Sequence, residues 1–170
     1  LAPNPWWQVD LGAVQSLGRV VVYNRLDYRP GLHNADNLQI LTSEDGQQWT
    51  LRHDNQGRHF GGIQGAEPLA VALAAGAVRA RFVRLRAPSA APLFFHLDEV
   101  EVYGPEPGGH NLALRQPADQ SSLSQWSTAK VQLRGAYPTA ARLERARRLA
   151  ADLQGQGVPV AAFLQQFDEL

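Results

Sequence analysis

The stretch Leu93-Phe-Phe-His-Leu-Asp-Glu-Val-Glu-Val-Tyr-Gly104 decides the fold class of this chain. Apolar and polar residues nearly alternate along it, and β-branched and aromatic residues are frequent. This is the period of a half-buried β-strand. Residues 105–109 follow as Pro-Glu-Pro-Gly-Gly, which can continue neither a strand nor a helix. We therefore predict that residues 93–104 form the last strand of a compact β-domain and that residues 105–109 are a linker.

Further segments before residue 104 have the same character, and no helical period occurs among them. Turn residues separate the segments, and Asp45-Gly46 is a hairpin signal. Short strands at close spacing describe an antiparallel sandwich, so the sequence predicts a mainly β domain over residues 1–104. The predicted strands are residues 6–12, 14–24, 38–42, 49–52, 69–73 and 78–86.

Two of these segments support more detailed expectations. In residues 6–12 we expect Trp7, Val9 and Leu11 to face the core and Gly12 to end the strand. The alternative is a solvent-facing Trp6 that acts as a platform for a sugar. Residues 78–86 read Val-Arg-Ala-Arg-Phe-Val-Arg-Leu-Arg. Four arginines in nine residues predict an edge-like strand with a solvated, ion-paired face.

The composition limits the classes of function. A chain of 170 residues can hold one ordinary domain and an appendage. Sixteen basic and sixteen acidic residues give a formal net charge of zero, which does not favour nucleic-acid binding. No apolar run approaches the ~20 residues that span a bilayer, so a membrane partner is not expected. The absence of cysteine excludes disulfides and thiolate metal sites, and the absence of methionine predicts a fragment of a longer protein.

Three motifs resemble, in the same order, those of discoidin-type domains. They are Pro5-Trp-Trp-Gln-Val-Asp-Leu-Gly12, then Ser43-x-Asp-Gly-x-x-Trp49, and finally Asp98-Glu-Val-Glu-Val-Tyr-Gly104. That superfamily is galactose-binding-like, and it includes coagulation-factor C-type domains, fucose-binding lectins and many bacterial carbohydrate-binding modules. The resemblance covers residues 3–104 and implies a jelly-roll topology for the sandwich.

The segment after the linker also carries a resemblance. Residues 110–122, His-Asn-Leu-Ala-Leu-Arg-Gln-Pro-Ala-Asp-Gln-Ser-Ser, are similar to the opening strand of a discoidin repeat. Residues 110–126 either begin a second repeat or fold back as a swapped or permuted strand, and the otherwise unpaired sheet edge favours the second explanation.

The remaining residues, 127–170, have a different pattern. Residues 140–154 are rich in Ala, Leu and Arg, with apolar residues at the spacing of one helix face. We predict a C-terminal α-helical extension that packs on the sandwich, on a neighbouring domain or on another chain.

The loop Arg25-Leu-Asp-Tyr-Arg-Pro-Gly-Leu-His33 is the strongest candidate for ligand binding. It combines guanidinium, carboxylate, imidazole and phenol groups, which together suit sugar hydroxyls and the C–H face of a sugar ring. The predicted carbohydrate-binding residues are Arg25, Asp27, Tyr28, Arg29 and His33, with Phe94, Phe95 and His96 from the start of the last strand. His59 and Phe60 are weaker candidates.

Arg25 and Asp27 also match the Arg-x-Asp of the fucose-lectin motif, which this sequence resembles in part. The later basic position of that motif falls on Leu32, and its upstream histidine would lie before residue 1. The sequence therefore does not predict which sugar is bound. A structural ion pair is the alternative role for Arg25 and Asp27, and core packing is the alternative for the two phenylalanines.

The resemblance further implies a structural calcium ion at the last strand. Its ligands would be the Glu99 carboxylate and the preceding backbone carbonyl, that of Asp98. Calcium prefers oxygen ligands. In the relatives a loop near the front of the domain supplies the other ligands, and the alternative here is an exposed strand carboxylate.

No enzyme motif is present. The chain has no Gly-x-Ser-x-Gly elbow, no His-Glu-x-x-His and no phosphate-binding loop. We predict a non-catalytic, lectin-like carbohydrate-binding module of a larger, bacterial-looking protein, and the resemblance implies an extracellular or cell-surface location. Two alternatives are an assembly module that self-associates or docks through its helices, and a phospholipid-binding domain like those of the coagulation factors.

Overall fold

The computed structural model describes residues 1–74 and 77–122. The chain divides into two compact units, Leu1–Gln132 and Leu133–Leu170, and every described residue lies in the first. The predicted helical extension, residues 127–170, falls outside the described residues. In the described part, no helix is long and apolar enough to span a bilayer.

Eight strands and one short 3-10 helix make up the described unit. The strands are β1 (Trp6–Leu17), β2 (Arg19–Asn24), β3 (Gln39–Ser43), β4 (Thr50–Asp54), β5 (Leu69–Ala72), β6 (Val78–Arg86), β7 (Leu97–Tyr103) and β8 (Ala118–Gln120). The helix η1 (Arg29–Gly31) lies in the β2–β3 connection.

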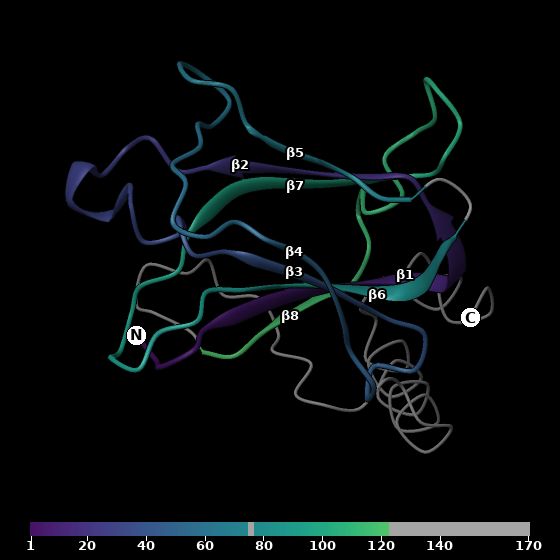
Figure 1. Cartoon of the computed structure of the whole chain (residues 1–170), viewed down its shortest axis with the longest axis horizontal. Coiled ribbons are helices and arrows are strands. Elements are labelled where there is room, and N and C mark those ends of the chain that lie inside the picture. Colours follow the sequence, from purple (N-terminus) through teal and green to yellow (C-terminus); the bar gives the residue numbers. More distant parts are fainter. Residues whose placement is uncertain (75–76, 123–170) are drawn as a thin grey trace, which may run out of the picture. The chain divides into compact units, whose positions relative to one another are not determined.

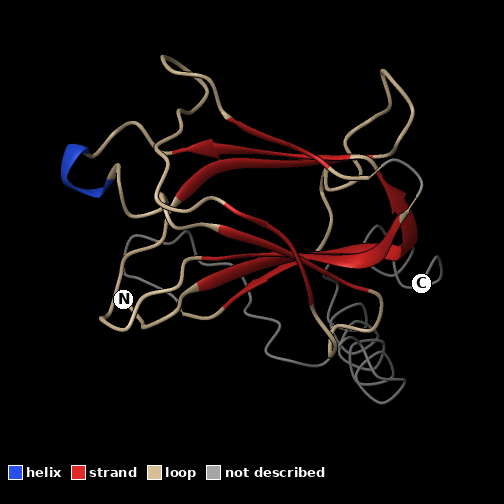
Figure 2. Ribbon diagram, viewed as in Figure 1, coloured by secondary structure: helices blue, strands red, loops and turns tan. Residues whose placement is uncertain are grey.

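The strands form two antiparallel sheets that face each other (Figure 1). The larger sheet has the order β4-β3-β6-β1-β8 and the smaller one has the order β5-β2-β7. Figure 2 shows the two layers of strands, with loops at their ends. The predicted mainly β sandwich is thereby confirmed, whereas its jelly-roll connectivity stays a prediction.

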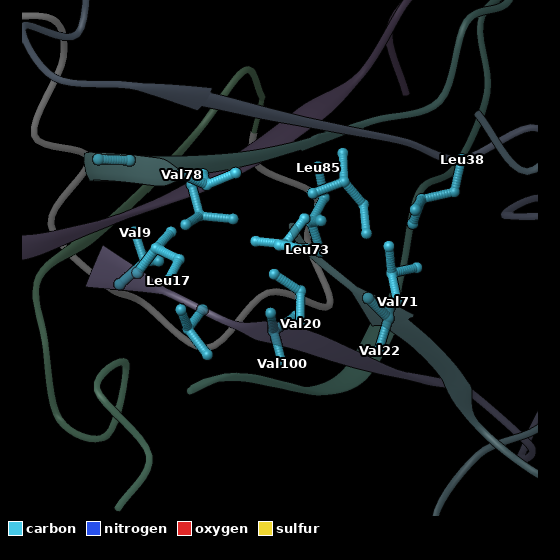
Figure 3. Close-up of a cluster of buried hydrophobic side chains, with 14 of the residues drawn as sticks. Val9, Leu17, Val20, Val22, Leu38, Val71, Leu73, Val78, Leu85 and Val100 are labelled. Atoms are coloured by element: carbon cyan, nitrogen blue, oxygen red, sulfur yellow. The ribbon is translucent and has the colours of Figure 1, made fainter. Parts of the chain in front are cut away.

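Apolar side chains from both sheets fill the space between the layers (Figure 3). Strands with one buried face alternate inward and outward side chains, and this pattern supplies the core. Val9 and Leu11 are buried and Trp7 packs against the core, as the sequence predicts. The other labelled core residues are Leu17, Val20, Val22, Leu38, Val71, Leu73, Val78, Leu85 and Val100.

The boundary predicted at Gly12 is wrong, because β1 continues through this residue to Leu17. The pairing of β1 with β6 shifts between Asp10 and Gln15, so the strand contains an irregularity instead of an end. Gly12 has a φ of +81°, which glycine adopts without steric cost. The break falls at Gly18, where an added Cβ would lie 2.5 Å from the carbonyl oxygen of Gly104.

The prediction that residues 78–86 form an edge-like strand is also wrong. β6 is the central strand of the larger sheet and pairs with β3 and β1. Three of its four arginines bond to side chains of those neighbours. Arg81 donates to both oxygens of Asp10, Arg84 donates to the Gln8 side-chain oxygen, and Arg86 donates to that of Gln39.

The last strand of the predicted domain is shorter than the alternating stretch that predicts it. β7 begins at Leu97, while Leu93 forms only an isolated bridge with Ala2. Phe94 and His96 therefore belong to the β6–β7 connection. This difference places both side chains on a loop at the end of the sandwich.

The short strand β8 extends the larger sheet beside β1. Trp7 pairs with Gln120 and Val9 with Ala118, and the backbone nitrogen of Ser121 donates to the Trp6 carbonyl at 2.9 Å. Residues of the segment after the linker thus lie against the start of the chain. The domain limits proposed for residues 1–104, 105–109 and 110–126 stay predictions.

Antiparallel pairing brings three connections to one end of the sandwich, at the left of Figure 1. These connections are β2–β3, β4–β5 and β6–β7, which run through residues 25–38, 55–68 and 87–96. The sequence-predicted ligand residues lie on them. We call these three segments the end loops.

Truncation of Leu38 to alanine should destabilise the domain strongly. Leu38 is fully buried in the core, so Leu38→Ala removes contacts and leaves a cavity, at a cost of about 2–5 kcal/mol. Leu51 is half exposed on β4, and Leu51→Ala should change the free energy of unfolding by less than about 0.5 kcal/mol. Urea denaturation measures both, and equal losses would contradict this packing.

Candidate functional site

A buried amide holds two of the end loops together. The side-chain nitrogen of Asn24 donates to the carbonyls of Leu32 at 2.8 Å and Phe60 at 3.2 Å. Its backbone nitrogen donates to the Gly61 carbonyl at 2.8 Å. An added Cβ at Gly62 would lie 2.2 Å from the Asn24 carbonyl oxygen, so only glycine permits this close approach. The loops therefore leave β2 in a fixed geometry.

Arg25 joins the β2–β3 and β6–β7 loops. Its Nε donates to Asp27 Oδ1 at 2.8 Å, and its Nη1 donates to His96 Nδ1 at 2.5 Å. The guanidinium carbon lies 5.3 Å from the centre of the Tyr28 ring, within the range of a cation–π contact. The Arg25 side chain is mostly covered, whereas that of Asp27 is 76% exposed. The arrangement presents a fixed carboxylate to solvent.

The charges around Arg25 set the protonation of its two partners. The hydrogen bond from Arg25 lowers the pKa of Asp27, which is therefore ionised and accepts hydrogen bonds only. Burial, and then the charge of Arg25, lower the pKa of His96. Because a guanidinium can only donate, His96 Nδ1 must accept, and the neutral ring carries its proton on Nε2. Nε2 of His96 is then a donor.

Aromatic side chains border this polar group. Tyr28 and Phe94 are about half exposed. The ring of Phe94 meets that of His96 edge to face, with centroids 6.0 Å apart. The side-chain nitrogen of Asn34 donates to the Phe94 carbonyl at 2.9 Å, which fixes the β6–β7 loop against the β2–β3 loop.

The structure brings together five of the eight predicted sugar-binding residues: Arg25, Asp27, Tyr28, Phe94 and His96. We call this group the Arg25 surface. The other three lie differently. Arg29 is exposed in η1, Phe95 packs against the core, and His33 contacts another group of residues. Whether any of these residues binds a sugar stays a prediction.

His33 belongs to a cluster with Asp36 and His59, which lies on two of the end loops. His33 Nδ1 lies 2.7 Å from Asp36 Oδ2, and His59 Nδ1 lies 3.0 Å from Asp36 Oδ1. The centroids of the two imidazole rings are 4.5 Å apart. Sequence reasoning missed Asp36, and the only local signal for it is a carboxylate three residues after a histidine.

Asp98 and Glu99, the predicted calcium ligands, lie exposed at the start of β7. Consecutive strand residues point to opposite faces, and Glu99 Oε1 accepts a hydrogen bond from the Val100 nitrogen at 3.0 Å. Within the described ranges, the cluster of three residues with metal-ligand geometry is His33, Asp36 and His59, and it excludes this pair. The calcium ion stays a prediction.

Comparison with known families agrees with this architecture. Residues 2–85 match the F5/F8 type C family described as the NedA-like, galactose-binding domain. The chain belongs to this family. The resemblance to coagulation-factor C-type domains is thereby confirmed. No match was found among curated proteins.

Three solved structures are similar to this galactose-binding-like domain. The lectin domain of lectinolysin in complex with Lewis B antigen is 30% identical, with 61% of this chain and 67% of that chain covered and a TM-score of 0.45. A mutant of that domain in complex with Lewis b is also 30% identical, with 61% and 66% covered and a TM-score of 0.46. A glycoside hydrolase is 25% identical, with 60% and 20% covered and a TM-score of 0.44.

The protonation of His96 predicts how pH affects the Arg25 surface. The pKa of His96 should lie below its ordinary value of 6.5 because of burial and the charge of Arg25. The unfolded chain then binds more protons than the folded one, so this contribution to stability is present above pH 6.5 and is lost as the pH falls. An NMR titration of the His96 ring protons measures the pKa.

Arg25→Ala should raise the pKa of His96 towards 6.5, because it removes the charge and part of the burial. A His96 pKa at or above 6.5 in the unaltered chain would contradict the hydrogen bond from Arg25.

Proposed function

We propose that this domain is a non-catalytic carbohydrate-binding module and that a sugar binds on the Arg25 surface. The observation that supports the proposal is the contact of one guanidinium with both an exposed carboxylate and a neutral imidazole. These three polar groups come from two different loops and are held in place before any ligand arrives.

The polar groups of the Arg25 surface match the chemistry of vicinal hydroxyls, each of which both donates and accepts. Asp27 accepts hydrogen bonds, while His96 Nε2 donates. A guanidinium has five N–H donors, and the contacts with Asp27 and His96 leave others for a ligand. Since these side chains are already ordered, binding loses less conformational entropy than it would with mobile side chains.

The aromatic side chains supply the second part of sugar recognition. Tyr28 on the β2–β3 loop and Phe94 on the β6–β7 loop are both about half exposed, and their rings lie beside Arg25 and His96, respectively. A pyranose ring has an apolar C–H face, which packs on such rings while its hydroxyls reach Arg25 and Asp27. Ligand sites generally combine apolar area with a few placed polar groups in this way.

Binding without hydrolysis is supported by the carboxyl groups of this surface. Most glycoside hydrolases need two carboxyl groups that flank the scissile bond. Asp27 is the one carboxylate among the five residues, and its lowered pKa does not suit a general acid. The Arg25 surface is therefore suited to holding a saccharide and not to cleaving it.

Arg25→Ala should weaken glycan binding by about 10-fold to 100-fold, because each hydrogen bond to a charged group contributes about 1.5–3 kcal/mol. A glycan array identifies the sugar, and calorimetry measures its affinity. Arg19→Ala is the matched control, since Arg19 lies at the other end of β2 and packs on the Tyr103 ring beside a shallow depression.

Two results would count against this location of the site. Unchanged affinity in Arg25→Ala would exclude the Arg25 surface. Loss of affinity in Arg19→Ala alone would move the site to the depression lined by Tyr103 and residues 104–109.

A specific observation favours phospholipid binding as a second candidate function. Four apolar side chains on the end loops are exposed: Leu26, Tyr28, Ile63 and Phe94. Arg29, which is also exposed, lies next to Tyr28. Exposed apolar side chains beside a basic residue suit insertion at a membrane surface. Sedimentation with vesicles of anionic phospholipid tests this, and a chain that binds a sugar but stays in the supernatant when the vesicles are pelleted excludes it.

A further inference from the structure

We propose that His33, Asp36 and His59 form a zinc-binding site that links the β2–β3 loop to the β4–β5 loop. One potential ligand atom from each of the three side chains lies within 4.8 Å of the others. This cluster is separate from the Arg25 surface. The side chains of His33 and His59 bond to Asp36, whereas the side chain of Arg25 bonds to Asp27 and His96.

The geometry already converges on one carboxylate. The Nδ1 atoms of His33 and His59 approach different oxygens of Asp36, at 2.7 and 3.0 Å. A four-coordinate zinc ion has its ligand atoms at about 2.0–2.2 Å, which sets them roughly 3.4 Å apart. Small side-chain rotations therefore convert the present arrangement into a coordination shell.

The backbone around Asp36 is fixed before a metal arrives. Its carbonyl oxygen accepts hydrogen bonds from the Gly57 nitrogen at 3.1 Å and the Asn55 side chain at 2.9 Å. The backbone nitrogen of Asn55 also donates to the Leu38 carbonyl at 3.0 Å. These bonds join the loop that carries His33 to the loop that carries His59. Metal binding therefore does not have to bring the two loops together.

The exposure of the three side chains suits an open metal site. The carboxylate is 13% exposed, whereas the side chains of His33 and His59 are 73% and 41% exposed. The ion would rest on a nearly buried anion and be reached from solvent past two imidazole rings. Three protein ligands leave a further coordination position for water or for an oxygen of another molecule.

The donor set decides which metal fits. Two imidazole nitrogens and one carboxylate suit zinc and neighbouring transition metals, whereas calcium and magnesium prefer shells made of oxygen alone. Zinc binding requires Nδ1 of both rings to be unprotonated, so a neutral ring with its proton on Nδ1 changes to the Nε2–H tautomer, and a ring protonated on both nitrogens releases one proton to solvent. The negative charge of Asp36 remains to balance the cation.

Calorimetric titration of the intact, EDTA-dialysed chain with zinc chloride tests the proposal. We expect one zinc ion per chain, with an affinity that added calcium chloride does not lower. His33→Ala and His59→Ala should each weaken zinc binding by about 100-fold or more, since the loss of an outer-shell partner alone costs about 10–100-fold. Asp36→Asn keeps the shape of the side chain but removes its charge, and it should weaken binding as strongly.

Matched variants distinguish this site from general histidine binding. His110→Ala removes an exposed histidine outside the cluster, and Arg25→Ala alters the proposed sugar site, so both should bind zinc like the unaltered chain. Zinc should raise the melting temperature of these two controls but not that of a His33→Ala, His59→Ala double variant, whose fold is checked by circular dichroism without metal.

An undiminished zinc affinity in the double variant would overturn the proposal. Absence of zinc binding by the unaltered chain would also overturn it and would leave the cluster as a hydrogen-bonded link between the loops. Because sugar binding is measured on other residues, its failure would leave these results unaffected.

Discussion

The register between β2 and β7 is the constraint on which the end loops depend. Pairing places Val20 opposite Val102 and Val22 opposite Val100, so all four side chains face the larger sheet and are buried. A shift of one residue would turn these side chains to solvent, so burial of the core specifies the register. The register then shifts by one residue between Tyr23 and Asn24, which sets Asn24 opposite Leu97. Arg25 directly follows β2 and His96 directly precedes β7, so their side chains come within hydrogen-bond distance.

The strand content was predictable because it follows from local alternation of apolar and polar residues. Strand ends and neighbours depend on non-local contacts, and there the sequence was less informative. Glycine is typical of a strand end, yet β1 continues beyond Gly12 because its residues pair with β6 on both sides of this position. The arginines of β6 led to the prediction of an edge strand because the sequence does not show their partners. These partners, Asp10, Gln8 and Gln39, lie on neighbouring strands, and the pairs follow only from the strand order of the sheet.

The candidate site was predictable to a similar degree. The composition of residues 25–33 predicts a polar, aromatic loop that binds a sugar. The structure places Arg25, Asp27 and Tyr28 of this loop together, and sugar binding by them stays a prediction. The contact of Arg25 with His96 spans 71 positions of the chain and depends on the β2–β7 pairing. The separation of His33 from this group, and its approach to His59, follow from the fold of the β2–β3 loop against the β4–β5 loop. No local pattern in the sequence encodes that approach.

The two histidine environments at this end of the sandwich have opposite electrostatics. His96 lies against the guanidinium of Arg25, which repels cations and keeps the imidazole neutral as a hydrogen-bond acceptor. His33 and His59 lie against the carboxylate of Asp36, which attracts a cation into the space between the rings. In the two proposals, the same side-chain type therefore serves an uncharged ligand in one place and a metal ion in the other. The neighbouring charge decides the chemistry, and the buried amides of Asn24 and Asn55, by fixing the loop backbones, decide which charge each histidine meets.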